Sequence, residues 1–454
     1  MQPQQLLARI GRAASPWSAT LALLEYWQGR PRHRRPAHDR FRAPHTEWSK
    51  LQNEVRLHFE DASSKRVRLN DADRDCIRAW LGATFEFDRV DAIAWGIDAG
   101  ASRTFAATWR QDLGLERRVI TLQPGEPYPI GTPELDSIGE GWSTDPASAT
   151  DPRENELPHV RFFKPPTCKW ITEVEFDFGY WDRLHNLLSG LREVATVHPN
   201  SSRSEWGKSP PGSSLFPLVL NDAAGQESRI VRLVQQARNT DFKAQIVVAP
   251  ELAATARAVA AVQADLDQGD ADVMVVAGSE HVVDQGRPVN RAFALMPSAE
   301  PLRHDKMVPL RRLARRQRAE QIEGIDANPV LRVYQADQFR LALLICKDFL
   351  DTDLVDDLCR LGINVVVVPA MSSKTRRFAT GAAQLVDRTQ GIAIIANGPY
   401  QWGPCLADPA SVFGQPFEAK PVVVCSPTGD CFTGFAPFQL GSSPSSAHWV
   451  AVRV

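Results

Sequence analysis

The sequence of 454 residues lacks the features that would place it in a membrane or outside the cell. It has no run of about 18 apolar residues, the minimum for a helix that spans a bilayer. The apolar stretch Ala19 to Leu24 is too short for a signal peptide. Its seven cysteines are an odd number scattered without a repeat, which is typical of a reducing compartment and not of a disulfide framework. These absences predict a cytoplasmic protein.

Several common motifs of enzymes and metal sites are also missing. No C-x-x-C pair occurs, so a structural zinc site is not indicated. Gly139-Glu140-Gly141 has no third glycine three residues on, which excludes a dinucleotide-binding loop there. The absence of a G-x-S-x-G elbow argues against a serine hydrolase of that type. No catalytic motif is found in the first 200 residues, so their role cannot be predicted.

The chain has no excess charge of either sign, since its net charge is −2. This excludes an overall attraction to nucleic acid or to an acidic membrane. Two local segments are rich in arginine. Residues 29–42 contain six arginines, and we interpret them as a solvated connector in preference to a nucleic-acid patch, because no stacking aromatic is interleaved beyond Phe41. Residues 311–318 (RRLARRQR) have arginines at helical spacing and predict a solvated or subunit-facing helix, with attraction of an acidic or phosphate-bearing substrate as the alternative.

The length of the chain predicts two domains. We expect an N-terminal α+β domain at 1–196, a linker rich in Ser, Pro and Gly at 197–214, and a C-terminal domain at 215–454. In the first domain, helical patterns cover 1–27, 48–59, 72–81 and 178–194, and short strands are predicted at 103–110 and 117–122. In the second, apolar strands at 216–220, 246–248, 273–276 and 292–295 and helices at 227–237 and directly after Glu251 indicate an α/β fold.

The segment from Arg340 to Met371 carries the first candidate functional residue, Cys346. An apolar run ends at this cysteine, and a polar turn, a helical pattern and a second apolar run from Val365 to Val368 follow. This order is typical of a βαβ unit, which places Cys346 at the carboxyl end of a strand near a helix N-terminus. A helix dipole there favours the thiolate. A lone cysteine after an apolar run is more often a buried core residue, so the interpretation depends on its companions.

Two charged residues earlier in the chain are the companions of Cys346. Glu251 ends the buried strand AQIVVAPEL, and Lys306 lies in the polar turn of LRHDKMVPL. Alone, Glu251 fits an acid in the first turn of a helix, and Lys306 fits a surface lysine. Together with Cys346, each at or just after a strand end, they form a constellation suited to acyl transfer.

At these residues the sequence resembles the nitrilase superfamily, the carbon–nitrogen hydrolases. The resemblance rests on APEL, RHDKMVPL and LLICKDF, on the strand VVVVPAMS that ends at Ser372, on Arg388 followed by IAIIANG, and on VVVCSPTGD. It covers roughly residues 213–454. It implies an α-β-β-α sandwich, a catalytic triad of Glu251, Lys306 and Cys346, and no metal or organic cofactor. It also implies a small amide as substrate and self-association into at least a dimer.

The family chemistry gives each residue a role. Glu251 would take the proton of Cys346. Lys306 and the backbone N–H of Lys347 would stabilise the oxyanion, and Ser372 would contribute to binding of the substrate or oxyanion. The family usually carries a second glutamate between the lysine and the cysteine, for which Glu320 and Glu323 are candidates and Glu320 is preferred.

Two departures from the family pattern refine these expectations. Nitrile-hydrolysing members typically carry Trp-Glu after the cysteine, so Lys347 at that position favours amide hydrolysis. The short stretch between Glu251 and Lys306 predicts a more open pocket, or one covered by the N-terminal domain.

Other interpretations remain open at this point. A rival within enzymes is transfer of the acyl group from the thioester to an amine instead of water. As a second class, the domain could be a catalytically silent module that contacts nucleic acid or an anionic partner through its arginine-rich segments. Cys359, Cys405, Cys425 and Cys431 have no comparable partners and are interpreted as structural.

Overall fold

The structure is a computed structural model, and the chain divides into two compact units. The N-terminal unit comprises residues 1–133 and 144–165, and the C-terminal unit comprises 134–143 and 166–454. Among the described residues, no helix is long and apolar enough to cross a membrane. The structure describes residues 1–28, 47–62, 68–83, 85–112, 119–129, 157, 160–191, 193–200, 202–207, 217–239, 243–269, 272–314, 319–336, 339–372, 375–389, 391–399, 422–425, 432–433 and 449–453.

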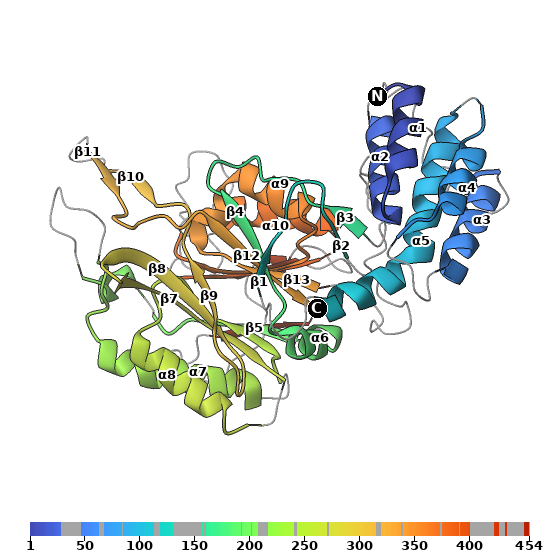
Figure 1. Ribbon diagram of the computed structural model, residues 1–454. Helices are drawn as coiled ribbons and strands as arrows, with labels where there is room; N and C mark the ends of the chain where they lie inside the picture. Colours follow the sequence, from blue (N-terminus) through green and yellow to red (C-terminus); the bar gives the residue numbers. More distant parts are fainter. Residues whose placement is uncertain are drawn as a thin grey trace. The chain divides into compact units, whose positions relative to one another are not determined.

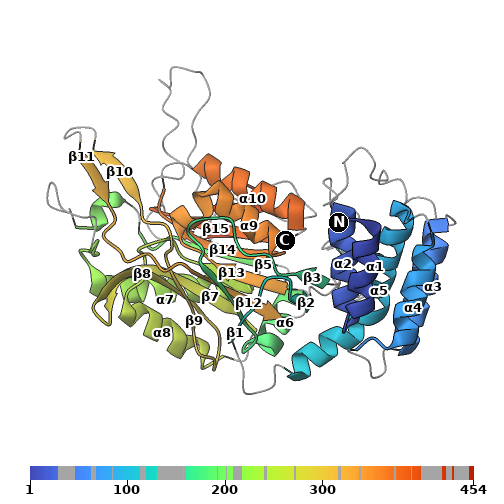
Figure 2. The same cartoon turned by 45° about the horizontal axis from the view of Figure 1, so that its top comes forward.

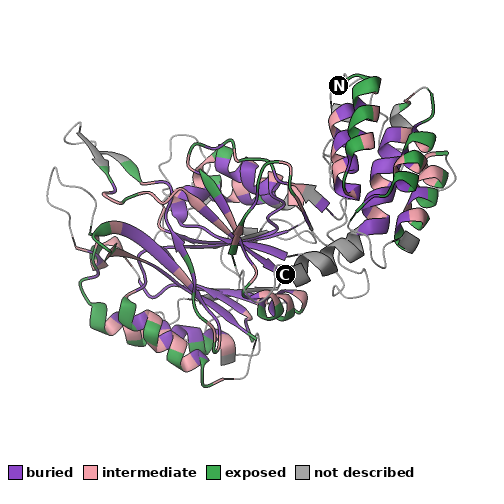
Figure 3. Cartoon of the chain, viewed as in Figure 1, coloured by how far each residue is buried: buried purple, intermediate pink, exposed green. Residues whose placement is uncertain are grey.

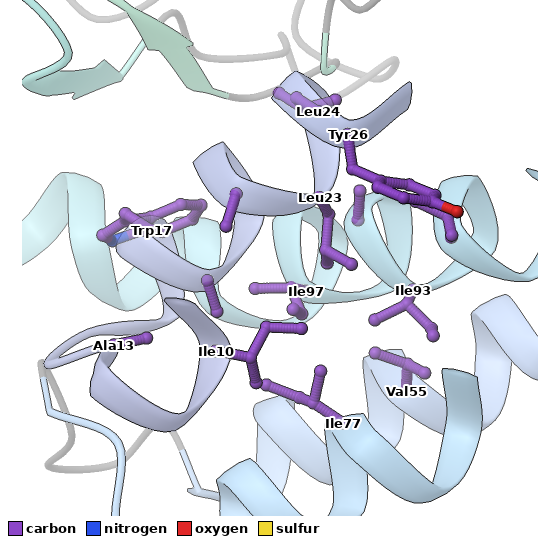
Figure 4. Close-up of a cluster of buried hydrophobic side chains, with 14 of the residues drawn as sticks. Ile10, Ala13, Trp17, Leu23, Leu24, Tyr26, Val55, Ile77, Ile93 and Ile97 are labelled. Atoms are coloured by element: carbon purple, nitrogen blue, oxygen red, sulfur yellow. The ribbon is translucent and has the colours of Figure 1, made fainter. Parts of the chain in front are cut away.

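The N-terminal unit is mainly helical (Figure 1). Its core is formed where apolar faces of the helices meet, and Figure 4 shows Ile10 beside Ile77 and Val55 beside Ile93 in this cluster. Asn70 caps the fourth helix by accepting a hydrogen bond from Asp73 N. The elements are α1 (Pro3–Arg12), α2 (Pro16–Gln28), α3 (Glu47–Ala62), α4 (Asp71–Leu81), α5 (Phe87–Asp112), β1 (Val119–Thr121), β2 (Pro127–Pro129) and β3 (Val160–Phe162).

Helix α5 corrects one sequence prediction. The segment 103–110, expected as a strand, lies inside this helix, because a short apolar run does not separate strand from helix by its pattern alone. Two glycines of α5 let α3 approach closely. A Cβ at Gly96 would lie 2.8 Å from Gln52 O, and one at Gly100 would lie 2.5 Å from Arg56 O. The packing of α3 on α5 therefore depends on both glycines.

One sheet of the C-terminal unit contains the strands β4-β12-β13-β14-β15-β16-β17 in this order. The pairs β4–β12, β13–β14 and β14–β15 are parallel, and the pairs β12–β13, β15–β16 and β16–β17 are antiparallel. Strands β13, β14 and β15 are buried along their whole length. The bounds are β4 (Glu173–Asp177), β12 (Val330–Ala336), β13 (Phe339–Leu343), β14 (Val365–Ala370), β15 (Ile392–Asn397), β16 (Val422–Cys425) and β17 (Phe432–Thr433).

The second sheet has six strands in the order β18-β5-β6-β7-β8-β9. Strands β5, β6 and β7 run parallel to one another, and the remaining pairs are antiparallel. The bounds are β5 (Glu193–Val197), β6 (Ile246–Val248), β7 (Met274–Asp284), β8 (Arg287–Leu295), β9 (Leu302–Asp305) and β18 (Trp449–Arg453).

The two sheets pack face to face between two outer layers of helices (Figures 1 and 2). Strands β14 and β15 contact β5, β6 and β7 across the interface, and the Tyr334 hydroxyl on β12 hydrogen-bonds the backbone of Arg303 on β9. Helices α9 (Thr352–Arg360) and α10 (Thr375–Thr389) cover one side, and α7 (Ala223–Asn239) and α8 (Ala256–Leu266) cover the other. Figure 3 shows buried strands inside and exposed helix faces outside. The predicted α-β-β-α sandwich is confirmed.

The division between the units lies earlier than the sequence suggests. Strands β4 and β5 and helix α6 (Trp181–Ser189) belong to the C-terminal unit, because β4 pairs with β12 and β5 pairs with β6. The chain thus divides near residue 165 and not at 196. The stretch 178–194 is not one helix, since α6 ends at Ser189 and β5 begins at Glu193.

The predicted linker is not a plain connector where the structure describes it. Its residues 197–200 and 202–207 include the buried His198, Asn200 and Trp206 and the short helix η3 (Arg203–Glu205), and 208–214 lie outside the described residues. These buried side chains make 197–207 part of the C-terminal unit. In the expected strand 216–220, only Leu220 makes an isolated bridge, to Trp206.

The arginine-rich segment after Lys306 begins as a strand and not as a helix. Its first residues form β10 (Arg311–Ala314), which pairs antiparallel with β11 (Ala319–Ile322), and 315–318 lie outside the described residues. Backbone pairing overrides the helical spacing of the arginines. The other arginine-rich segment, 29–42, also lies outside the described residues.

Candidate active site

Cys346 lies in the turn that follows β13, at the start of the short helix η4 (Cys346–Leu350). Its backbone is in the left-handed region with φ of 44°, which is unfavourable for a residue with a side chain. Strained conformations of this kind cluster at functional sites, where surrounding contacts hold them. The thiol is buried, and its Sγ lies 4.0 Å from the carbonyl oxygen of Met371 after β14.

Glu251 is held by a second tight turn, which follows β6. Its backbone N–H donates to Ala370 O at the end of β14, across the sandwich (3.3 Å). The next residue, Leu252, has φ of 60°, and its N–H donates to the Ser279 hydroxyl. Gly278 lies against this turn with φ of 94°, and a Cβ there would lie 2.3 Å from Pro250 O. Helix α8 begins only at Ala256, so the residues directly after Glu251 are a turn and not the predicted helix.

Lys306 follows β9 and is the centre of the site. Its side chain is 1% exposed, and Nζ donates to Glu251 Oε1 and to Glu323 Oε2, both at 2.7 Å. The sequence-predicted residues Glu251, Lys306 and Cys346 therefore come together in one buried cluster.

The second glutamate of the cluster is Glu323, which corrects the preference for Glu320. Glu323 follows β11, and its backbone N–H donates to Leu310 O while Leu310 N donates back to Oε2 (both 2.8 Å). The β10–β11 hairpin thus returns the chain to Lys306 at residue 323. Glu320 lies on β11, and its side chain is outside the described part of the structure.

The charges of the cluster hold one another in place. Burial alone would lower the pKa of Lys306, but the carboxylates of Glu251 and Glu323 outweigh it and raise that pKa well above its usual value. Burial would likewise raise the pKa of Glu323, but Lys306 and His281 lower it below its usual range. At neutral pH the lysine is therefore a cation and Glu323 an anion.

The thiol of Cys346 is protonated in this resting arrangement. Burial and the negative Glu251 raise its pKa well above the usual value, against the opposite effect of Lys306. The same carboxylate is a hydrogen-bond partner of the thiol. A nucleophilic Cys346 therefore needs a base at the moment of attack, and Glu251 is placed to act as one.

Two polar residues that the sequence prediction missed complete the cluster. Asn290 on β8 donates from Nδ2 to Glu251 Oε1 and to Glu323 Oε1, both at 3.0 Å. The Nε2 atom of His281 on β7 lies 3.0 Å from Glu323 Oε1. Its Nδ1 accepts a hydrogen bond from Leu218 N, so the ring proton is on Nε2. Neither residue stands out in the sequence, because β7 and β8 each carry further polar residues, such as Glu280 and Arg291.

Asp348, also missed, joins the cysteine turn to the lysine turn. Its Oδ1 accepts from Met307 N and Val308 N (3.1 and 2.8 Å), beside Lys306. Its Oδ2 accepts from Ile345 N at 3.0 Å and lies 2.9 Å from His304 Nε2. The side chain is fully buried, so these contacts satisfy a carboxylate that would otherwise be costly to bury.

Lys347 and Ser372 lie next to the cluster. Lys347 is half-buried in η4, directly after the cysteine. Ser372 follows Met371, and its backbone N–H donates to Asn397 Oδ1 at 2.8 Å. Their roles in oxyanion or substrate binding stay predictions. Cys359 is buried in α9, whereas Cys405, Cys425 and Cys431 have no described side chain.

Solved structures similar to this chain were found, although no family model and no curated protein matches it. One is Nit3 of Saccharomyces cerevisiae, a member of branch 10 of the nitrilase superfamily, with 12% identity, 58% of this chain and 90% of that chain covered, and a TM-score of 0.39. Another is an amidase from Nesterenkonia sp., with 17% identity, 58% and 89% covered, and a TM-score of 0.37. A third is a CN-hydrolase superfamily protein from Xanthomonas campestris, with 12% identity, 58% and 90% covered, and a TM-score of 0.36.

The C-terminal unit has the α-β-β-α sandwich fold that the sequence resemblance implies. In this domain the two turns that carry Glu251 and Cys346 come from different sheets and meet at the same end of the sandwich. The lysine reaches them from the edge of the second sheet. The site is thus assembled from both halves of the sandwich, and it depends on how the two sheets pack.

Proposed function

We propose that the C-terminal unit is a nitrilase-like domain that hydrolyses a non-peptide carbon–nitrogen bond, with Cys346 as nucleophile and Glu251 as general base. The observation that supports this most is the buried cluster in which Lys306 contacts two carboxylates beside a protonated thiol. A cluster built for stability alone would not need a nucleophile held in a left-handed conformation.

The first half of the reaction forms a thioester. Glu251 takes the proton from Cys346, and the sulfur attacks the carbonyl carbon of an amide. Lys306 stabilises the negative oxygen of the tetrahedral intermediate, together with the backbone N–H of Lys347. The carbon–nitrogen bond then breaks, and the proton on Glu251 passes to the departing nitrogen, which leaves as ammonia or an amine.

The second half returns the enzyme to its starting state. Glu251 takes a proton from water, whose oxygen attacks the thioester carbon. The carbon–sulfur bond breaks, the carboxylic acid leaves, and the sulfur recovers its proton from Glu251. One carboxylate serves both halves because its proton is returned each time. Glu323 keeps Lys306 in place throughout and takes the position that the sequence prediction gave to Glu320.

An amide substrate is proposed over a nitrile because Lys347, and not a tryptophan, follows the cysteine. Transfer of the acyl group to an amine would use the same thioester. It differs from hydrolysis only in the molecule that attacks the thioester, which is an amine in place of water. Assembly into a homodimer or larger homo-oligomer and a cytoplasmic location stay predictions from the sequence.

The test compares wild type with Cys346→Ala, Glu251→Gln and the matched control Cys359→Ala, which removes a buried thiol in α9. Ammonia release from a panel of short aliphatic amides and intact mass after iodoacetamide are measured. We expect wild type and the control to release ammonia, Cys346→Ala to release none, and Glu251→Gln to be slower by about 100-fold or more.

The proposal is wrong if Cys346→Ala keeps ammonia release. It is also wrong if Cys346 reacts with iodoacetamide no faster than the other thiols and no amide is cleaved. In that event, salt-sensitive binding of a nucleic acid or anionic partner through the arginine-rich segments becomes the better account.

A further inference from the structure

Asn290 contacts three of the four residues of the proposed catalytic cluster. Its side-chain Nδ2 donates to Glu251 Oε1 and to Glu323 Oε1, both at 3.0 Å. Its backbone carbonyl accepts from Lys306 N at 2.9 Å. The residue is completely buried on β8, so water does not compete for these bonds.

The cluster needs a donor that adds no charge. Glu251 and Glu323 both contact Lys306, so two carboxylates share one cation and repel each other in a buried site. A second lysine would neutralise the carboxylates but would also weaken Glu251 as a base. The amide of Asn290 binds one oxygen of each acid and leaves their charges in place.

The amide also fixes which oxygen of Glu251 remains for the thiol. Oε1 of Glu251 accepts from both Lys306 Nζ and Asn290 Nδ2. The other oxygen carries neither of these bonds, and the thiol of Cys346 is a further partner of the same carboxylate. Asn290 thus orients the base toward the sulfur.

The oxygen of the Asn290 amide argues against a purely structural role. Oδ1 is buried and has no hydrogen-bond partner in the described part of the chain. An unpaired buried acceptor destabilises the fold, and leucine, of similar size, would avoid it. The side chain is therefore explained by its NH₂ group alone.

We propose that Asn290 is a positioning residue, which holds Glu251, Glu323 and Lys306 in the arrangement that lets Glu251 take the proton of Cys346. This rests on the function proposed above. The groups that titrate around Asn290 are Glu251, Glu323, Lys306, Cys346 and, through Glu323, His281.

The experiment measures two rates between pH 5.5 and 9. This range extends about one to two pH units on either side of neutrality, where His and Cys side chains ordinarily titrate. They are alkylation of Cys346 by iodoacetamide, read by intact mass, and ammonia release from short aliphatic amides. The variants are Asn290→Leu and Asn290→Asp. The control is Asn364→Leu, which removes a buried asparagine at the opposite end of β14. Thermal unfolding of each variant shows that it is folded.

We expect Asn290→Leu to slow both rates by about 10- to 100-fold near pH 7, the range for a lost hydrogen bond to a charged group. Without the amide, one carboxylate takes up a proton at a higher pH, so the rate relative to wild type recovers as the pH rises. In Asn290→Asp, only the protonated acid can donate, so the relative rate recovers as the pH falls. Asn364→Leu should lower stability and leave both rates per folded molecule unchanged.

The opposite pH trends of the two variants separate positioning from structure. If Asn290→Leu stays within about twofold of wild type, or both variants follow the wild-type pH profile at a constant ratio, the inference is wrong. Failure of the proposed function would look different. In that case wild type would cleave no amide, while the alkylation series would still report whether Asn290 orients Glu251.

Discussion

Replacing Lys306 by methionine tests whether the lysine is the charge that holds the cluster together. Methionine keeps the length and apolar volume of the side chain but removes the cation. Glu251 and Glu323, each 4% exposed, are then left as two buried carboxylates without their shared partner. Breaking a buried ion pair by removing one partner costs about 3–5 kcal/mol, so Lys306→Met should lose that much stability near neutral pH.

The pH dependence of this loss has a definite sign. In wild type, the pKa of Glu323 is held below its usual range by Lys306 and His281, so its contribution is present at neutral pH and is lost only as the pH falls toward that low pKa. In the variant, repulsion and burial raise the pKa of the carboxylate pair. The penalty is then greatest at high pH and shrinks as the pH falls and one acid becomes protonated. Lys306 itself stays charged over this range, because its own pKa is raised.

The measurement is urea unfolding of wild type and Lys306→Met at pH 8 and at pH 5.5. The free-energy difference should be larger at pH 8 by about 1 kcal/mol or more, since one pKa unit corresponds to about 1.4 kcal/mol. Lys306→Met/Glu323→Gln, which removes one of the two negative charges, should recover part of the loss. Lys50→Met removes a lysine from an exposed pair on α3 and should change stability by less than about 1 kcal/mol. A loss for Lys306→Met that is equal at both pH values would refute this electrostatic reasoning.

Three further substitutions probe how the turns and helices are held. An asparagine at position 348 cannot accept hydrogen bonds from all four donors that Asp348 binds. We expect Asp348→Asn to slow alkylation of Cys346, measured by intact mass, by about tenfold. For amide hydrolysis, we expect kcat to fall by a larger factor than KM rises. Gly278→Ala should displace the turn that carries Glu251 and lower ammonia release per folded molecule. Gly100→Ala should destabilise the N-terminal unit by at least about 1 kcal/mol in thermal unfolding and leave Cys346 alkylation unchanged.

The sequence identified the residues that lie at strand ends. Glu251 and Cys346 each follow a continuous apolar run, and such a run predicts a buried strand whose end faces a site. The α-β-β-α layering came from the resemblance to a family, and the sheet order confirms it. Strand ends and chain order therefore identified Glu251, Lys306 and Cys346 as candidates, and their roles as a triad came from the resemblance to a family.

The features that could not be predicted from the sequence depend on pairing between distant segments of the chain. Glu323 reaches Lys306 because the β10–β11 hairpin closes with Arg311 opposite Ile322, and the register of a hairpin is not encoded in the spacing of two glutamates. Asn290 and Asp348 serve the site through bonds to residues 33 to 41 positions away. The domain boundary was placed too late for the same reason, since β5 finds its partners only further along the chain.

The pairing of β5 with β18 has a consequence for synthesis of the protein. Glu193–Val197 and Trp449–Arg453 are separated by 251 residues (449 − 197 − 1), yet they lie side by side in the second sheet. At about 5–20 residues per second, a ribosome needs on the order of 13–50 s to make the intervening chain. During that time one edge of β5 has no strand to cover it, and exposed strand edges recruit other chains. The nascent domain therefore carries an uncovered edge of β5 until β18 emerges, which is the interval when chaperones would bind it.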